Sequence, residues 1–273
     1  MVTTLVLPRV LGRRLEQGLA RSLAVAGRNA TLTRHLGYWW LLASGFFEPL
    51  LYLLSIGFGV GALVGDLPLP DGRTVPYAEF VAPAMLAASA MNGALAETTM
   101  NFFSKMKFMR LYDAVLATPV TPIEAALGEL MWATVRGGMY CAAFLIVMVA
   151  MGLTTVWGAL LAFPATLLVC FAFGAAGMVL ATFMSSWQDF DYLMAAQFAL
   201  FLFSGTFAPV QSFPVVVRWA MEATPLYHGV ELVRAATTGT FQWVLVWHLA
   251  YLLVLLAVAL RFAGKRMGGL LLK

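Results

Sequence analysis

Charged residues are scarce in this 273-residue chain. Lys, Arg, Asp and Glu together make up 11% of it and hydrophobic residues 62%, with a mean hydropathy of +0.85. A soluble domain has about 25% charged and about 45–50% apolar residues, and its core could not bury this excess. The composition therefore excludes a soluble globular protein. It predicts a polytopic integral membrane protein, because several apolar stretches approach the ~20 residues that cross a bilayer.

Side chains suited to catalysis or metal binding are also few. The two cysteines, Cys141 and Cys170, lie within apolar stretches, where a thiol behaves as a small hydrophobe. The three histidines, His35, His228 and His248, are far apart and fall on different sides of the predicted membrane, with no carboxylate at metal-ligand spacing. We therefore expect no zinc site, no catalytic residue and no cofactor bound by this chain.

A phosphate-binding loop is missing as well. A loop of the form G-x-x-x-x-G-K-[ST] needs two glycines, a lysine and a hydroxyl residue. The only Gly-Lys pair, Gly264-Lys265, has Ala259 at the other glycine position and Arg266 at the hydroxyl position. If ATP is used, ATP and Mg must therefore be bound by a partner chain.

Apolar stretches recur along the sequence. The first begins near Tyr38 after a long basic segment, whereas a cleavable signal peptide has a short basic start and an early hydrophobic region. We therefore expect no signal peptide, an amino-terminal unit over residues 1–36 and a single transmembrane domain over residues 37–273. Six spans are expected, at about Gly37–Val64, Tyr77–Thr99, Met131–Met151, Val156–Phe183, Tyr192–Ala208 and Trp243–Phe262.

Lysine and arginine are unevenly distributed between the two sides of these spans. With the amino terminus inside, three lie outside (Arg73, Arg218 and Arg234) and fourteen inside: Arg9, Arg13, Arg14, Arg21, Arg28, Arg34, Lys105, Lys107, Arg110, Arg136, Arg261, Lys265, Arg266 and Lys273. Cytoplasmic flanks retain positive charge, so both termini are expected in the cytoplasm. The basic pI of about 9.2 then indicates orientation, and no nucleic acid is expected as a partner.

The amino-terminal segment has the pattern of an amphipathic helix. Leucines and alanines occupy one arc of the helical wheel, at Leu11, Leu15, Leu19, Leu23, Ala26 and Ala30, and arginines the opposite arc, at Arg13, Arg14, Arg21 and Arg28. We expect a helix along the inner membrane surface with its arginines toward lipid phosphates. An unstructured basic tail is the alternative, favoured by Gly12, Gly18 and Gly27.

The longest inner loop, residues 101–129, predicts helix, turn, helix. A first helix over residues 104–117 would be stopped by Thr118-Pro119, and a second would begin with Thr121 as N-cap, Pro122 at the first position and Glu124 at the third. A charged, aromatic tip suits the docking of a soluble protein: Lys105, Lys107, Arg110, Tyr112 and Asp113. A surface loop without a partner is the alternative.

The outer segment over residues 209–240 is too polar for an ordinary span and too apolar for a free aqueous loop. Short helices that enter the outer leaflet and turn back fit this composition. Glu231 and Arg234 are spaced to form a helical ion pair, for which we favour a structural role over substrate recognition.

Glu48 stands directly before Pro49 in the first expected span. An intramembrane carboxylate usually faces a cavity or a partner, so Glu48 is a candidate for substrate contact or for a structural hydrogen bond. Tyr38, Trp39 and Trp40 fit an interfacial aromatic belt, with ligand binding as the alternative.

Two motifs resemble a known family. The first is Leu111-Tyr112-Asp113-Ala114-Val115-Leu116-Ala117-Thr118-Pro119-Val120, followed by Leu127-Gly128-Glu129, and the second is Thr224-Pro225-Leu226-Tyr227-His228-Gly229-Val230-Glu231-Leu232-Val233-Arg234. Together they resemble the ABC-2 type permeases, in particular the nodulation-factor lipo-oligosaccharide exporters, alongside the daunorubicin-resistance and O-antigen polysaccharide permeases. The resemblance covers essentially the whole chain.

This resemblance implies an all-α membrane protein with six transmembrane helices, an amino-terminal interface helix, a coupling helix and outer re-entrant helices. It implies a homodimer with two separate ATPase subunits in the bacterial inner membrane. The residues expected to contact the ATPase are Lys105, Lys107, Arg110, Leu111, Tyr112, Asp113, Ala114, Leu116, Thr118 and Pro119. Those expected to form the outer gate are Pro209, Phe213, Pro225, Leu226, Tyr227, His228, Glu231 and Arg234.

An amphiphile is the expected cargo, because the expected walls are apolar and basic residues at the inner surface could gather an anionic lipid or glycolipid. A hydrophobic drug is an alternative cargo. An ion-driven secondary transporter would need ionisable residues at the membrane midplane, for which only Glu48 qualifies. A membrane-embedded enzyme would need clustered acidic or nucleophilic groups, and Asp189 and Asp191 are too few.

Overall fold

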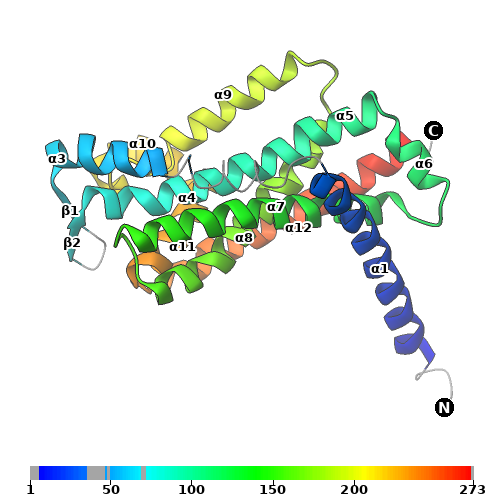
Figure 1. Cartoon of the computed structure of the whole chain (residues 1–273), viewed down its shortest axis with the longest axis horizontal. Helices are drawn as coiled ribbons and strands as arrows, with labels where there is room; N and C mark the ends of the chain where they lie inside the picture. Colours follow the sequence, from blue (N-terminus) through cyan, green and yellow to red (C-terminus); the bar gives the residue numbers. More distant parts are fainter. Residues whose placement is uncertain (1–5, 36–46, 48–49, 69–71, 272–273) are drawn as a thin grey trace.

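Long helices build the core of the molecule. The computed structural model describes residues 6–35, 47, 50–68 and 72–271. Figure 1 shows the long helices lying along one common direction: α4 (Tyr77–Ala96), α7 (Pro122–Ala150), α8 (Val156–Ala181) and α12 (Val244–Leu271). The bundle therefore has two distinct ends, and short elements gather at each.

One end, called here the α6 end, carries the π-helical segment η2 (Glu97–Asn101), α5 (Phe102–Lys107) and α6 (Leu111–Leu116), and α1 (Val6–His35) crosses the bundle there (Figure 1). The opposite end, called the hairpin end, carries η1 (Ser55–Val60), α3 (Gly61–Val64), β1 (Asp66–Pro68), β2 (Thr74–Pro76), η3 (Val210–Ser212), α10 (Val215–Glu222) and α11 (Pro225–Thr238). Helix α9 (Asp189–Leu202) is inclined away from the bundle (Figure 1).

Helix α8 is the centre of the packing, because it contacts α4, α7, α11 and α12. Its alanines Ala172, Ala175 and Ala181 are fully buried. Small side chains let helix backbones approach closely within a membrane protein, where packing takes over from the hydrophobic effect between helices. This accounts for the alanine-rich sequence of the central helix.

Three helices in the described residues are long and apolar enough to cross a bilayer, over Pro122–Ala150, Val156–Ala181 and Val244–Gly269. Each contains or overlaps a span expected from the sequence. The capping box predicted at Thr121 is confirmed: its hydroxyl accepts the Glu124 N–H, and the Glu124 side chain accepts the Thr121 N–H.

A short antiparallel hairpin is the exception to the expected all-α architecture. Strands β1 and β2 pair with Leu67 opposite Val75. Val75 is 7% exposed and belongs to the main core, which holds the hairpin against α4. The connecting turn contains Gly72 with φ of +84°, a conformation that glycine adopts without a Cβ clash. Three-residue strands are too short for an alternating pattern to show in the sequence.

Candidate coupling and gating sites

The loop at the α6 end is more sharply folded than the sequence predicted. The prediction of a single helix over residues 104–117 is wrong. Helices α5 and α6 are separated by a turn in which Arg110 has φ of +46°. Phe108 leaves the helical path and stacks on Trp187, with ring centroids 5.6 Å apart and planes at 12°. Phe103 packs edge-on against Trp187 at 5.6 Å. This aromatic cluster joins the loop to the turn before α9.

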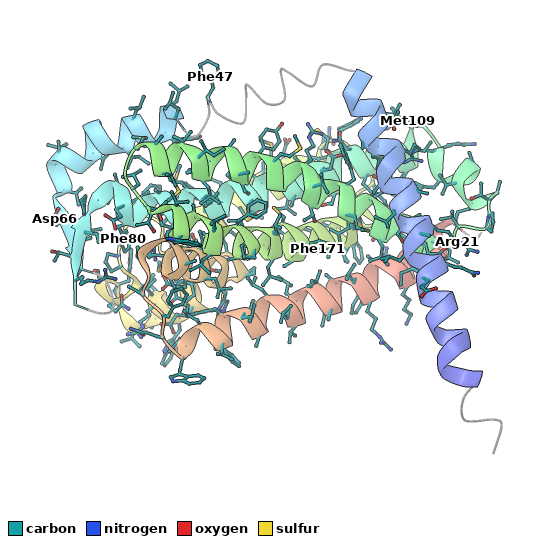
Figure 2. The ribbon with its side chains drawn as sticks, turned by 60° about the horizontal axis from the view of Figure 1, so that its bottom comes forward. Arg21, Phe47, Asp66, Phe80, Met109 and Phe171 are labelled. Carbon is teal, nitrogen blue, oxygen red and sulfur yellow. The ribbon has the colours of Figure 1, made fainter. Side chains whose placement is uncertain are left out.

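The turn and α6 expose a charged tip at the end of the bundle. Lys107, Arg110 and Asp113 are exposed, and Met109 beside them is labelled in Figure 2 at this same end. The other expected docking residues divide into exposed Ala114, Thr118 and Pro119 and half-buried Leu111 and Leu116. The exposed set offers charges of both signs to a docking protein.

Tyr112 does not belong to this exposed tip. Its side chain is 1% exposed and packs on Phe102 with ring centroids 5.2 Å apart. Burial, followed by the nearby Glu129 carboxylate, raises the pKa of Tyr112 well above its usual value. Tyr112 therefore anchors α6 to the protein interior as a neutral phenol, which corrects the sequence prediction of an aromatic tip.

Glu129 on α7 is a buried carboxylate that binds side chains from two other helices. It is 3% exposed. Lys105 Nζ on α5 donates to it at 2.6 Å, Arg28 Nη2 on α1 at 2.9 Å and Asn29 Nδ2 on α1 at 2.9 Å. The side chain of Lys105, expected at the docking tip, is only 16% exposed. Lys105 is thus an internal partner of Glu129.

Helix α1 directs arginines toward the protein. Arg21 Nη1 lies 3.5 Å from Glu124 Oε1, and Arg28 pairs with Glu129. Figure 2 shows α1 crossing the end of the bundle with Arg21 at the crossing. The apolar face points outward and includes Leu19 and Leu23, which are 58% and 50% exposed. The structure therefore corrects the expected direction of Arg21 and Arg28, which face α7 carboxylates in place of lipid phosphates.

At the hairpin end, Arg234 joins three segments. It is 4% exposed. Its guanidinium pairs with Glu231, donates to the Gly205 carbonyl at 2.9 Å and to the Phe80 carbonyl at 3.3 Å, and lies 4.0 Å from the centroid of the Phe80 ring. The ion pair predicted between Glu231 and Arg234 is confirmed. It belongs to a wider contact that holds α11 against α4 and the chain after α9.

The other expected gate residues lie around this contact. Leu226, Tyr227 and His228 are buried, Pro209 and Pro225 are half-buried, and Phe213 is 37% exposed. Sequence reasoning placed His228 and His248 far apart, but their Nδ1 atoms are 2.6 Å apart. His228 also stacks on Tyr251, with ring centroids 3.9 Å apart. Because these residues lie on two different helices, no local spacing signals the pair.

A groove of about 530 Å³ runs between α4 and α9. Its apolar lining is rich in methionine and phenylalanine, namely Met85, Met100, Met194, Phe144, Phe190, Phe198 and Phe201, together with Tyr52 and Leu193. Its polar lining consists of Ser89, Asn92, Thr99 and Gln197. The groove is therefore mostly apolar with a few hydrogen-bonding groups. The candidate contact residues Tyr38, Trp39, Trp40 and Glu48 lie outside the described residues.

Comparison with known proteins agrees with these features. Residues 26–238 match the ABC-2 type transporter family. The chain is 32% identical over 216 residues to Nodulation protein J of Rhizobium leguminosarum bv. trifolii, which covers 79% of this chain and 78% of that one. It is 29% identical over 236 residues to Nodulation protein J of Neorhizobium galegae, with 85% and 86% covered. The chain therefore belongs to the ABC-2 type transporter family, whose members are membrane transport subunits that work with a separate ATPase subunit.

Proposed function

We propose that this chain is the permease subunit of an ATP-driven exporter that moves an amphiphile from the cytoplasmic side of the inner membrane outward. The carrying observation is the exposed charged tip at Lys107, Arg110 and Asp113. A charged tip on an internally anchored loop suits the docking of a soluble ATPase, and the sequence holds no phosphate-binding loop of its own.

The proposed assembly is a homodimer with two ATPase subunits. Each chain would span the membrane six times with both termini in the cytoplasm, and the α6 end would then face the cytoplasm. Residues at the hairpin end, around Tyr227, His228 and Arg234, would close the path on the outer side. The distribution of lysine and arginine supports this orientation.

A lipo-oligosaccharide, a glycolipid or a lipid-linked saccharide is the proposed cargo. The methionine and phenylalanine lining of the groove between α4 and α9 suits an acyl or polyprenyl chain, since methionine adapts its shape to irregular apolar partners. Gln197 and Asn92 provide hydrogen-bonding groups in the same groove. The same apolar lining favours a second candidate cargo, a hydrophobic drug. Glu48, Tyr38, Trp39 and Trp40 remain proposed substrate contacts.

Charge reversal at the tip tests the proposal. The complex is purified from its native membrane with the ATPase that accompanies it, and ATP hydrolysis is measured in nanodiscs. Asp113→Lys and Lys107→Glu each reverse an exposed charge, so we expect loss of ATPase association with an unchanged melting temperature. Asp191→Lys, which reverses an exposed charge on α9, is the matched control and should retain the ATPase. The proposal is refuted if the chain is active in transport without any ATPase. It is also refuted if the two tip variants retain the ATPase as Asp191→Lys does.

A further inference from the structure

We infer that Glu129 is a positioning residue that joins the amphipathic helix α1 to α5 and, through α5, to α6, so that α1, α6 and the start of α7 move as one body. The inference rests on the proposed function only in taking ATP binding as the source of movement at α6. It gives α1 a part in transmission as well as at the membrane surface.

The contacts of Glu129 come from segments distant in sequence. Arg28 and Asn29 lie 101 and 100 residues before it, and Lys105 lies 24 residues before it. A buried carboxylate is stable only while its charge and hydrogen-bonding capacity are satisfied, and moving α1 or α5 away would remove a cationic hydrogen-bond donor from it. The carboxylate therefore favours the arrangement in which α1 and α5 are both held against α7.

Helix α6 is tied to the same contacts through Tyr112. Its buried ring packs on Phe102 of α5. The ring also belongs to the same buried cluster as Ala126 and Leu130 of α7, which are close in sequence to Glu129. Because Lys105 of the same helix α5 donates to Glu129, displacement of α6 acts on Glu129 through α5.

Close packing beside Glu129 fixes the rotation of α1. A Cβ on Gly128 would lie 2.6 Å from the Ser22 carbonyl oxygen and 2.6 Å from Val25 Cβ, so the α1 backbone approaches α7 at this glycine. One turn earlier on each helix, Arg21 and Glu124 form a second ion pair. With its polar face held here, α1 must turn its leucines outward, where the bilayer surface can bind them.

Glu97 offers a matched control because it is buried in a similar way but does not reach α1. It is 7% exposed, and it accepts from Arg136 at 2.6 Å and from Asn101 at 2.7 Å. These contacts join α7 to the end of the α4 helix. Replacing Glu97 therefore removes a buried carboxylate that pairs with α7 but leaves the contacts between Glu129 and α1 in place.

Distance measurement by pulsed electron paramagnetic resonance tests the inference. Spin labels are attached at Ala30→Cys on α1 and Ala117→Cys at the end of α6, both exposed positions; the native Cys141 and Cys170 are 0% exposed and stay unlabelled. The complex with its ATPase is measured without nucleotide and with trapped ATP. The labelled chain is diluted with unlabelled chain, so that one protomer in each homodimer carries labels. We expect one narrow distance peak within that protomer, the same in both states. Glu129→Gln should abolish the narrow peak, and Glu97→Gln should retain it.

Two results would overturn the inference: a wild-type distance that changes with ATP, or a narrow peak that persists in Glu129→Gln. Should Glu129→Gln fail to accumulate, Arg28→Gln breaks the same link from α1 and must broaden the peak. A second label pair, Ala117→Cys with Ala220→Cys on exposed α10, reports on the proposed function separately. If ATP leaves that distance unchanged, the proposed function fails, whereas the effect of Glu129→Gln on the first pair still decides the inference.

Discussion

Replacing Gly128 by alanine tests the close approach of α1 and α7. The added Cβ would lie 2.6 Å from both the Ser22 carbonyl oxygen and Val25 Cβ. The oxygen belongs to the backbone, so no rotamer change relieves the clash and α1 must move away. Overpacking of this kind costs ~1–3 kcal/mol, and the gain of alanine over glycine in a helix returns ~0.5–1 kcal/mol. We expect a net loss of stability of ~1–2 kcal/mol.

Gly27 supplies the control on α1 itself, since a Cβ there would meet nothing within 4 Å. Gly27→Ala should therefore be neutral or stabilising. Thermal unfolding of the purified protein in detergent gives the order of stability. Limited trypsin digestion reports on α1 directly, because Arg21 and Arg28 become accessible when the helix leaves α7. We expect faster cleavage at these arginines in Gly128→Ala alone.

Equal melting temperatures and equal cleavage rates for the two alanine variants would refute the reasoning. Such a result would mean that α1 does not pack on α7 at Gly128, and the geometry argued for Glu129 would lose its support. A lower melting temperature without faster cleavage would place the strain elsewhere in α7.

Three further predictions follow from buried or capped polar groups. Arg234→Ala strands Glu231 and two backbone carbonyls, so it should lower stability by ~3–5 kcal/mol, measured by thermal unfolding; Arg234→Lys should recover only part, because an ammonium group cannot reproduce the planar fork of donors. His248→Phe leaves Nδ1 of His228 without the partner that lies 2.6 Å away and should cost ~1–3 kcal/mol, with unfolding in denaturant as the measurement. Asp189 accepts the N–H groups of Ser185 and Ser186, and these hydrogen bonds lower the pKa of Asp189 below the usual value of an aspartate. Its stabilisation of the turn is therefore complete above about pH 4 and lost as the pH falls through the folded pKa, which Trp187 fluorescence should follow in the wild type but not in Asp189→Asn.

Local chemistry made part of the fold predictable. The capping box at Thr121 and Glu124 depends on residues three positions apart, so the sequence located the start of α7 correctly. The amphipathic spacing of the amino-terminal segment likewise fits the single helix α1. The motif around Pro225 coincides with the first turn of α11. In each case the signal and its structural cause lie within one or two helical turns.

Long-range contacts explain where prediction failed. The helical pattern of the sequence before Tyr112 continues through Phe108. In the structure, Phe108 stacks on Trp187, 79 positions further along, and the helix is broken at Arg110. No residue near Phe108 in the sequence indicates this contact. The burial of Tyr112 and the His228–His248 contact have the same origin. Each depends on which helix lies next to which, and apolar periodicity identifies a buried face without naming its partner.

The arginines of α1 illustrate how a correct pattern can lead to a wrong partner. A helical wheel separates the arginines from the leucines, and a basic face next to a membrane suggests lipid phosphates. Arg21 and Arg28, however, meet Glu124 and Glu129, which the wheel of α1 alone cannot reveal. Since these two arginines pair with carboxylates of the protein, we expect binding of this part of α1 to a bilayer to depend on its exposed leucines more than on anionic lipid. In the proposed exporter, a helix held by carboxylates on one face and by lipid on the other would carry movement between α6 and the membrane surface.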